Sequence, residues 1–310
     1  MLKLWAFREG SIMSNQDSMS TQEFNNRFEE AIQVVDGPHP ERAVQLLEDL
    51  MLEASEFHVA DDEIVIELRM YLGSALWRSG LHARAVRVLE AALGDATREL
   101  GWENRVTFSC AGNLCRALSG AGRPKRALRL ARMTYKKRIV AFGELDNGTL
   151  NSLGHLASLH FDAGNVYKAT ELMTSLYEKR AQAFGEHDSR TRSSKYNLTV
   201  MRAQRDNNEQ DLLNLLVEYT NELGAEHPYT IGVWKHIAAM FERNGDLEEA
   251  LETWLEVELK LSNAFGEVAL PTLSALRRRL QVQQALGDNQ VTQQLEIVGN
   301  TIQRITGQDV

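Results

Sequence analysis

The chain has 310 residues, of which 43% are hydrophobic and 7% aromatic, and its formal net charge at pH 7 is -9. This length and apolar content suffice for a substantial core, while the five prolines and the lack of an apolar run of membrane-spanning length predict a soluble, helix-rich protein. Cys110 and Cys115 are spaced to lie on different faces of one helix, which argues against a disulfide or a metal pair and predicts a reducing, cytoplasmic location.

The first 60 residues are predicted to hold a tail and a cap. Residues 1–20 have too little apolar content for a signal peptide and end in a polar stretch, so we expect a disordered N-terminal tail. Residues 21–60 are expected to form a degenerate capping hairpin with helices near 21–35 and 40–57. Ala43 lies 42 residues before Ala85, and the segment 36–40 holds a glycine and two prolines that suit a turn.

From residue 61 onwards the sequence repeats itself. Threonines recur at intervals of 42, 42, 39 and 42 residues, at Thr107, Thr149, Thr191, Thr230 and Thr272. Each follows a glycine by six residues: Gly101, Gly143, Gly185, Gly224 and Gly266. A second set of glycines (Gly80, Gly122, Gly164, Gly245, Gly287) marks another turn, and alanines follow it by five residues at Ala85, Ala127, Ala169 and Ala250. Such a period is typical of a solenoid whose units bury their apolar faces against their neighbours.

One unit explains these marks. Apolar residues keep helical spacing from Thr149 to Gly164 and again from Tyr167 to Phe184, so each unit is predicted to be a helical hairpin. We expect Thr149 to be the N-cap of the first helix and Gly185 to end the second helix in the left-handed conformation. The alanines allow the paired helices to approach closely. The predicted all-α solenoid has about six hairpins, at roughly 61–101, 102–143, 144–185, 186–224, 225–266 and 267–307.

Two units depart from the pattern. The unit from Thr191 to Thr230 is three residues short, and its turn at 205–208 contains no glycine, so we expect a local change in superhelical pitch. The last unit is expected to present a polar outer face as a terminal cap, formed by Gln293, Gln294, Asn300 and Gln303.

The loops between units resemble those of a known family. The blocks Phe142-Gly143-Glu144, Phe184-Gly185-Glu186-His187-Asp188, Gly224-Ala225-Glu226-His227-Pro228 and Phe265-Gly266-Glu267, each leading to a repeat threonine, look like the loops of 42-residue tetratricopeptide repeats of the kinesin-light-chain type. Asn113-Leu114, His155-Leu156-Ala157, Asn197-Leu198 and His236-Ile237-Ala238 resemble the core of that family's first helix. The resemblance covers about residues 65–307 and implies a right-handed solenoid whose first helices line a concave groove.

The family's groove positions fall here on a set of polar and cationic residues: Asn113, Arg116, Asn151, His155, Ser158, Tyr196, Asn197, Lys235, His236, Arg243, Arg277 and Arg278. The resemblance implies that asparagines hold the backbone of an extended peptide while arginines and lysines bind its acidic groups. The alternative is that Asn113, His155 and Asn197 are polar residues bonded between adjacent first helices.

Motifs for catalysis are missing from the sequence, which contains no HExxH, GxSxG, phosphate loop or paired CxxC. Gly120-Ala121-Gly122 lies at a hairpin turn without a preceding strand, so it does not indicate a nucleotide site. The eight histidines are dispersed without ligand spacing, and we expect no metal and no cofactor. The sequence therefore predicts a non-catalytic protein-interaction module, an adaptor or scaffold that binds an extended, partly acidic peptide or partner segment.

Charge is segregated along the chain. Residues 78–138 contain fourteen Lys/Arg and four Asp/Glu, which gives +10 there and leaves -19 elsewhere. This asymmetry favours anionic partners or head-to-tail self-association. The alternative is that the basic residues form an ordinary solvated face. Nucleic acid is not expected, because the basic stretch lacks interleaved aromatics and the pI is about 5.5. Two further hypotheses are an assembly subunit of a larger complex and a peptide-sensing regulator that hinges in the short unit.

Overall fold

The computed structural model describes residues 15–35, 37, 40–56 and 62–306. Within these residues, 86% of the chain is helical and no strand occurs, which confirms the all-α prediction. The chain divides into two compact units, residues 1–159 (unit 1) and 160–310 (unit 2). Residues 1–20 were predicted to form a disordered tail, and residues 1–14 of that segment lie outside the described residues. Residues 15–20 are instead the first part of a helix.

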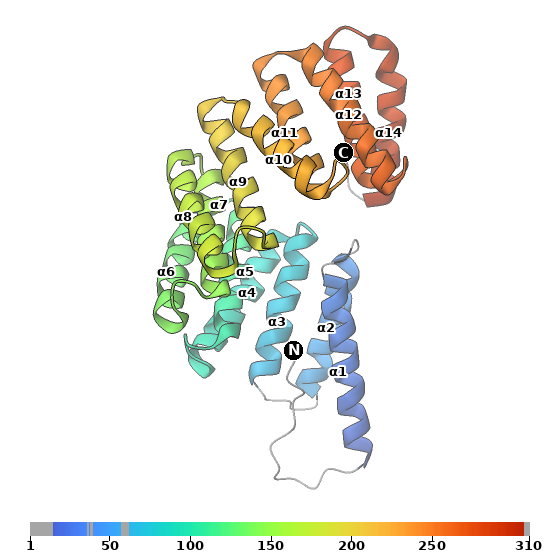
Figure 1. Ribbon diagram of the computed structural model, residues 1–310. Helices are drawn as coiled ribbons and strands as arrows, with labels where there is room; N and C mark the ends of the chain where they lie inside the picture. The colour runs from blue at the N-terminus through green and yellow to red at the C-terminus, as the bar shows by residue number, and fades with distance from the viewer. Residues whose placement is uncertain (1–14, 36, 38–39, 57–61, 307–310) are drawn as a thin grey trace. The chain divides into compact units, whose positions relative to one another are not determined.

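The helices follow one another as hairpins in both units (Figure 1). Unit 1 contains α1 (Asn15–Val35), α2 (Pro40–Glu56), α3 (Asp62–Arg78), α4 (His82–Glu99), α5 (Arg105–Gly120), α6 (Pro124–Phe142) and most of α7 (Asn147–Asp162). Unit 2 contains α8 (Val166–Phe184), α9 (Ser189–Asp206), α10 (Gln210–Leu223), α11 (Pro228–Asn244), α12 (Leu247–Phe265), α13 (Leu270–Ala285), the 3-10 turn η1 (Asn289–Val291) and α14 (Thr292–Thr306). None of the described helices combines the length and the hydropathy needed to cross a bilayer.

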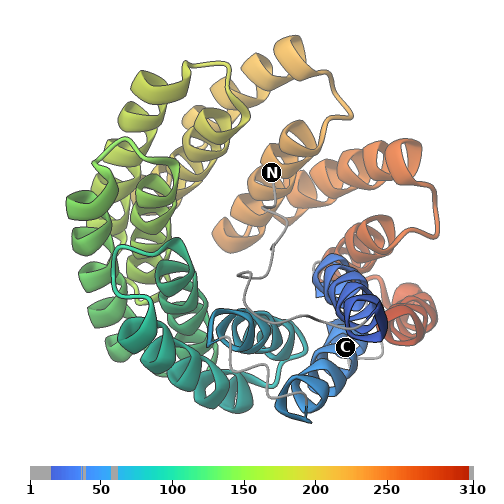
Figure 2. The same ribbon diagram turned by 90° about the horizontal axis from the view of Figure 1, so that it is seen from below.

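Within each unit, the first helices of the hairpins form one layer. From α1 through α6, and again from α8 through α14, consecutive helices pack on one another, as Figure 2 shows. In addition, the first helices of neighbouring hairpins touch one another, α1 with α3, α3 with α5, and α9 with α11. The second helices lie behind that layer. Side chains on the first helices of one unit are thereby brought onto a common surface.

Small residues set the distance between paired helices. The four repeat alanines are completely buried, as predicted: Ala85, Ala127, Ala169 and Ala250. Gly73 on α3 serves the same purpose from the other side, because a Cβ there would lie 2.3 Å from the Cγ atom of Leu89 on α4. The leucine occupies the space that a larger residue would need.

The loop between hairpins differs from the prediction in two details. Gly185 has a positive φ of 88° but an extended ψ of 161°, so it is not in the left-handed helical region. That combination is accessible essentially to glycine alone, which is a stricter requirement than the predicted one. Thr149 is not the N-cap of α7 either, because the Asp146 carboxylate accepts a 3.0 Å hydrogen bond from the Thr149 amide and so caps the helix.

The short unit replaces the missing glycine with an asparagine. Asn207 ends α9 at φ 48° and ψ 44°, the left-handed region, where Gly245 (φ 87°, ψ 8°) ends α11. Asparagine tolerates this conformation better than most residues. The deletion shortens the second helix, since α10 has 14 residues and α12 has 19. The expected change in superhelical pitch stays a prediction.

Ion pairs repeat along the chain with the sequence period. The same position pair joins the two helices of three hairpins, as Arg27–Glu53, Arg69–Asp95 and Lys195–Glu218. A second pair joins successive second helices, as Arg84–Glu48 and Arg126–Glu90. The α1–α2 hairpin therefore uses the contacts of a full repeat. At the other end, the expected polar side chains of α14 are exposed: Gln293, Gln294, Asn300 and Gln303.

Candidate functional site

The first helices of unit 2, α9, α11 and α13, carry the candidate site. α9 packs directly on α11. Glu242 near the end of α11 ties that helix to α12 and α13. It forms a 2.8 Å ion pair with Arg278 on α13 and accepts a 2.6 Å hydrogen bond from the indole of Trp254 on α12. The carboxylate of Glu242 is only 15% exposed, so this network fixes the position of α13 beside α11.

An aromatic cluster lies between α9 and α11. The ring of Tyr196 is centred 5.6 Å from the ring of His236 and 5.8 Å from that of Tyr229. Gly232 makes room for this arrangement, because a Cβ at that position would lie 2.7 Å from the Tyr196 hydroxyl oxygen. The phenol therefore lies directly against the backbone of α11.

The side chains of Tyr196 and His236 are uncharged at neutral pH. Burial, with a smaller contribution from Tyr229, raises the pKa of Tyr196 to about 12. Burial also lowers the pKa of His236, and the neighbouring charges of Lys235 and Arg243 lower it further. The cluster thus offers a neutral aromatic surface with hydrogen-bonding groups, flanked by the exposed cations Lys235 and Arg243.

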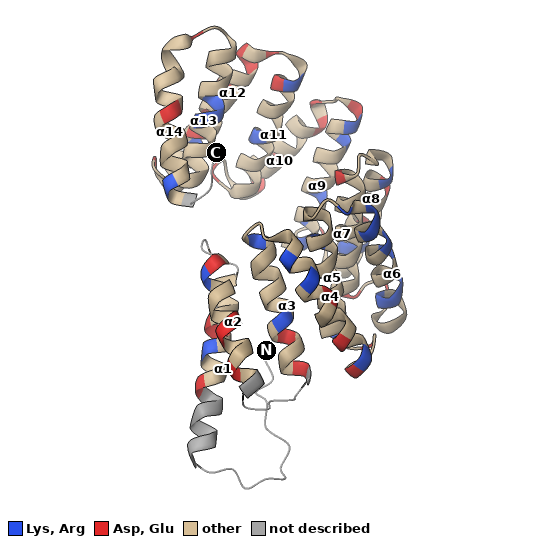
Figure 3. Ribbon diagram, turned by 180° about the vertical axis from the view of Figure 1, so that it is seen from behind, with Lys and Arg blue, Asp and Glu red and all other residues tan. Residues whose placement is uncertain are grey.

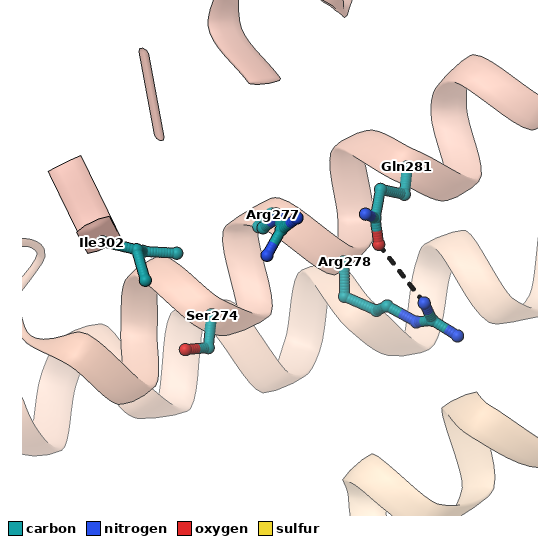
Figure 4. A pocket seen from close by; sticks show the side chains of 5 residues that line it. All are labelled: Ser274, Arg277, Arg278, Gln281 and Ile302. Carbon is teal, nitrogen blue, oxygen red and sulfur yellow. Dashed lines mark hydrogen bonds between the residues drawn. The ribbon is translucent and has the colours of Figure 1, made fainter. Parts of the chain in front are cut away.

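Two hollows lie against α13 and α14. The first, of about 300 Å³, is shown in Figure 4 and is lined by Ser274, Arg277, Arg278, Gln281 and Ile302. The second, of about 370 Å³, is lined by Arg277, Gln281, Gln284, Leu295, Glu296, Gly299, Asn300 and Gln303. Arg277 and Gln281 belong to both walls.

Arg277 and Arg278, two of the three arginines of α13, differ in their partners. Arg278 is held by Glu242 and also donates a 3.3 Å hydrogen bond to the side-chain oxygen of Gln281, drawn as a dashed line in Figure 4. Arg277 is half-buried and forms no ion pair with any described residue. Its guanidinium is therefore the cation of this site that remains available to an anionic ligand.

The predicted residues of unit 1 form a smaller group. Asn113 on α5 accepts a hydrogen bond from Arg116 one turn later, and the Arg116 guanidinium carbon lies 5.3 Å from the ring centroid of Trp77 on α3. This bond of Asn113 lies within its own helix rather than between first helices. The remaining candidates lie exposed, Asn151, His155 and Ser158 on α7 in unit 1, and Asn197 on α9 in unit 2.

The structure thus brings Tyr196 together with His236, Arg277 with Arg278, and Asn113 with Arg116. The sequence did not point to Ser274, Gln281, Tyr229, Gly232 or the α14 side of the hollows. Gln281 follows Arg277 by four residues on one helix face and could have been found from that spacing. A glycine inside a helix, such as Gly232, signals close approach but does not identify the side chain that approaches.

The two cysteine thiols of α5 are poorly reactive in this fold. Cys110 and Cys115 on α5 are both buried free thiols, and burial raises the pKa of each to about 12. Thiols in such surroundings are poor nucleophiles and poor metal ligands. Within the described ranges, no cluster of three or more His, Cys, Asp or Glu side chains has the arrangement of a metal site.

The sequence matches no protein-family model and no curated protein. The fold is similar to that of nearly identical TPR-like repeats of a Podosopora anserina protein described as a putative kinesin light chain, with 19% identity and a TM-score of 0.54 over 64% of this chain and 95% of that chain. It is also similar to a tetratricopeptide repeat protein from Parabacteroides merdae, with 16% identity and a TM-score of 0.50 over 93% and 100% of the two chains.

A third similar structure is the Rap conjugation gene regulator of plasmid pLS20 in complex with the Phr* peptide, with 13% identity and a TM-score of 0.57 over 97% of this chain and 81% of that chain. At these identities the likeness concerns the fold alone. Together with the helical hairpins, the buried repeat alanines and the repeated ion pairs, it shows that this chain has the fold of tetratricopeptide-type helical repeat proteins.

Proposed function

We propose that the chain is a non-catalytic protein-interaction module, an adaptor or scaffold, whose second unit holds an extended, partly acidic peptide along α9, α11 and α13. One observation carries this proposal. Arg277 is a half-buried guanidinium without an ion pair among the described residues, and it stands in the common wall of two hollows. Partial burial of a cation without a hydrogen-bonded ion-pair partner is costly, and a bound carboxylate would compensate it.

The chemistry of the surface fits such a ligand. Arg277 binds a carboxylate with two parallel hydrogen bonds, and the adjacent Gln281 amide and Ile302 side chain contact the rest of that residue. Further along the same layer, Asn197 holds the peptide backbone while Tyr196 and His236 pack against a side chain. Lys235 and Arg243 supply further positive charge at the exposed edge. For unit 1 by itself, we propose that Asn113, Arg116, Asn151, His155 and Ser158 contact a partner segment in the same manner.

Peptide binding is known for a protein with a similar fold. The Rap regulator of pLS20 was solved in complex with the Phr* peptide. Another similar structure, with a TM-score of 0.53 and 10% identity, is a Rap protein complexed with Competence and Sporulation Factor. A helical-repeat fold of this kind can therefore hold a peptide, which supports the choice of ligand class for this chain.

The test is peptide selection on the full chain. A display library of random short linear peptides is selected against the wild-type protein, and the affinity of the enriched peptides is then measured by fluorescence anisotropy. We expect enrichment of Asp or Glu and at least a tenfold loss of affinity in Arg277→Met.

Arg304→Met is the matched control, because Arg304 is an exposed cation on α14 that lines neither hollow. Its affinity should equal that of the wild type. The proposal is wrong if the selected peptides show no acidic preference, or if Arg277→Met and Arg304→Met bind them equally well.

A further inference from the structure

The outer surface of α6 is a strip of cations without counter-charges. Lys125, Arg129, Arg132 and Lys136 are exposed and follow one another at spacings of four, three and four residues, which places them on one face of the helix. The helix contains no acidic residue, and none of these four side chains forms an ion pair with a described residue. Arg126, by contrast, is paired with Glu90 on α4 at 2.7 Å. Figure 3 shows the basic segments along α6.

The same strip carries exposed apolar residues. Met133 is 39% exposed and Val140 is 89% exposed, and both lie on the face that bears the four cations. No aromatic side chain is exposed on this helix, so the strip lacks the groups on which nucleic-acid bases would stack. A basic surface with apolar residues inside it fits a protein partner that offers acidic and apolar side chains together.

The outer face of α12 in unit 2 has this composition. α6 and α12 are both second helices of their hairpins and both have 19 residues. Glu248 and Glu252 are the second and sixth residues of α12, and they occupy the positions that Lys125 and Arg129 hold in α6. Both glutamates are exposed and form no ion pair with a described residue.

The apolar residues of α12 complete the match. Leu255 is 48% exposed and Leu259 is 56% exposed, one turn apart on the face that bears the two glutamates. Equivalent helices of the same protein thus present faces of similar length, each with exposed apolar residues, but with opposite charge. Since the protein as a whole carries a net charge of -9, copies repel one another unless these particular faces meet.

We propose that the protein associates with itself, the α6 face of one copy (Lys125, Arg129, Arg132, Met133, Lys136, Val140) packing on the α12 face of a second copy (Glu248, Glu252, Leu255, Leu259). The contact joins two different surfaces, so it is head-to-tail and builds rings or open chains. It involves second helices only and leaves the first-helix surface of unit 2 accessible, so it does not depend on the proposed peptide binding.

The test is sedimentation velocity of the full chain over a range of concentrations, at about 0.01 M and about 1 M salt, where the Debye length is about 30 Å and about 3 Å. At low salt the average mass should rise with protein concentration above the 35.0 kDa of the monomer. At high salt the average mass should fall back towards that of the monomer. The double variants Lys125→Glu/Arg129→Glu and Glu248→Lys/Glu252→Lys should each weaken association about tenfold or more, because each replaces attractions by repulsions.

Mixing the two double variants distinguishes this contact from a general effect of net charge on association. Each variant alone should associate weakly: the first places two glutamates on the α6 face opposite the acidic α12 face, and the second makes the α12 face basic like the α6 face. In the 1:1 mixture the unchanged α6 face of one variant meets the unchanged α12 face of the other, so association should recover. Arg304→Glu is the control, with an exposed cation reversed on α14, and it should associate like the wild type. Circular dichroism and melting of each variant confirm that folding is intact.

Two outcomes would overturn the proposal. One is a wild-type mass that stays at that of the monomer at every concentration in low salt, and another is a failure of the mixture to recover. If a single-stranded RNA probe binds the wild type and not the α6 variant while no self-association occurs, the basic strip serves nucleic acid instead.

Discussion

The hydroxyl of Thr230 donates a 2.8 Å hydrogen bond to the backbone carbonyl of Gly224, six residues earlier. The same bond joins Thr107 to Gly101 at 2.7 Å and Thr272 to Gly266 at 2.8 Å. Each bond closes the loop between one hairpin and the next, where the glycine has left the helix and its carbonyl has no helical partner. At these three loops the interval of six residues between glycine and threonine therefore reflects a loop contact, whereas the Thr149 hydroxyl bonds Asp146 instead.

Removing the Thr230 hydroxyl should cost stability. Thr230→Val keeps the shape of the side chain but leaves the Gly224 carbonyl with only the long 3.4 Å hydrogen bond from the His227 amide. We expect a loss of about 1 kcal/mol in the free energy of unfolding. Urea denaturation measures this loss. Thr191→Val is the matched control, because the buried Thr191 hydroxyl has no hydrogen-bond partner in the structure and its loss should be neutral or slightly stabilising. Equal losses in the two variants would contradict the role given to the bond.

Gly73 should tolerate no side chain. An added methyl group would lie within 3 Å of three side-chain carbons of the fully buried Leu89, so Gly73→Ala should destabilise the protein by about 1 to 3 kcal/mol despite the better helix propensity of alanine. A Cβ added at Gly112 on α5 would meet no atom within 4 Å, so Gly112→Ala should instead stabilise the protein by up to about 1 kcal/mol. Thermal melting should show a lower melting temperature for Gly73→Ala and a higher one for Gly112→Ala. A higher melting temperature in both variants would show that α3 and α4 are not in close contact at Gly73.

Asn207 should be replaceable by glycine and not by alanine. Its left-handed conformation at φ 48° is strained for a residue with an ordinary side chain, so Asn207→Ala should lose about 1 to 2 kcal/mol. Asn207→Gly should be close to neutral, because glycine adopts this conformation freely. Urea unfolding of both variants makes the comparison, and an undiminished stability in Asn207→Ala would contradict the assigned turn.

Stability should depend on pH through His236. Its folded pKa lies below the ordinary value of 6.5, so between the two values the unfolded chain binds more protons than the native protein. The free energy of unfolding should therefore fall as the pH decreases through 6.5 and stop falling below the folded pKa. Other groups titrate in this range too, so the measured quantity is the difference between the wild type and His236→Gln in urea unfolding at several pH values. A constant difference across that range would contradict the burial of a neutral imidazole.

Much of the fold could be predicted from the sequence, because repeated contacts leave repeated residues. The alanines of the helix pairs, such as Ala127, and the glycines of the loops mark the hairpins at their correct positions. The role of Thr149 was predicted wrongly, since a threonine near a helix start suggests an N-cap, and only the geometry shows that Asp146 provides that cap. The ion pair between Arg27 and Glu53 was not predicted, although the equivalent pair recurs in later hairpins.

The candidate site was less predictable. Arg277 and Arg278 are adjacent in the sequence and look equivalent there, yet Glu242 on another helix holds Arg278 and leaves Arg277 in the wall of two hollows. The α14 side chains that complete those hollows come from a helix expected only to cap the solenoid. Contacts between helices separated by a whole repeat decide which arginine is available to a ligand. The sequence pattern of a single helix does not reveal those contacts.

The most direct test of the proposed function is a double-mutant cycle between Arg277 and the acidic residue of a selected peptide. Calorimetry would measure the binding of the peptide and its Glu→Gln or Asp→Asn analogue to the wild-type chain and to Arg277→Met. A carboxylate held by Arg277 predicts a coupling energy of about 1.5 to 3 kcal/mol, with each single change removing most of the affinity that the pair provides. A coupling energy near zero, with the two changes simply adding, would contradict the account.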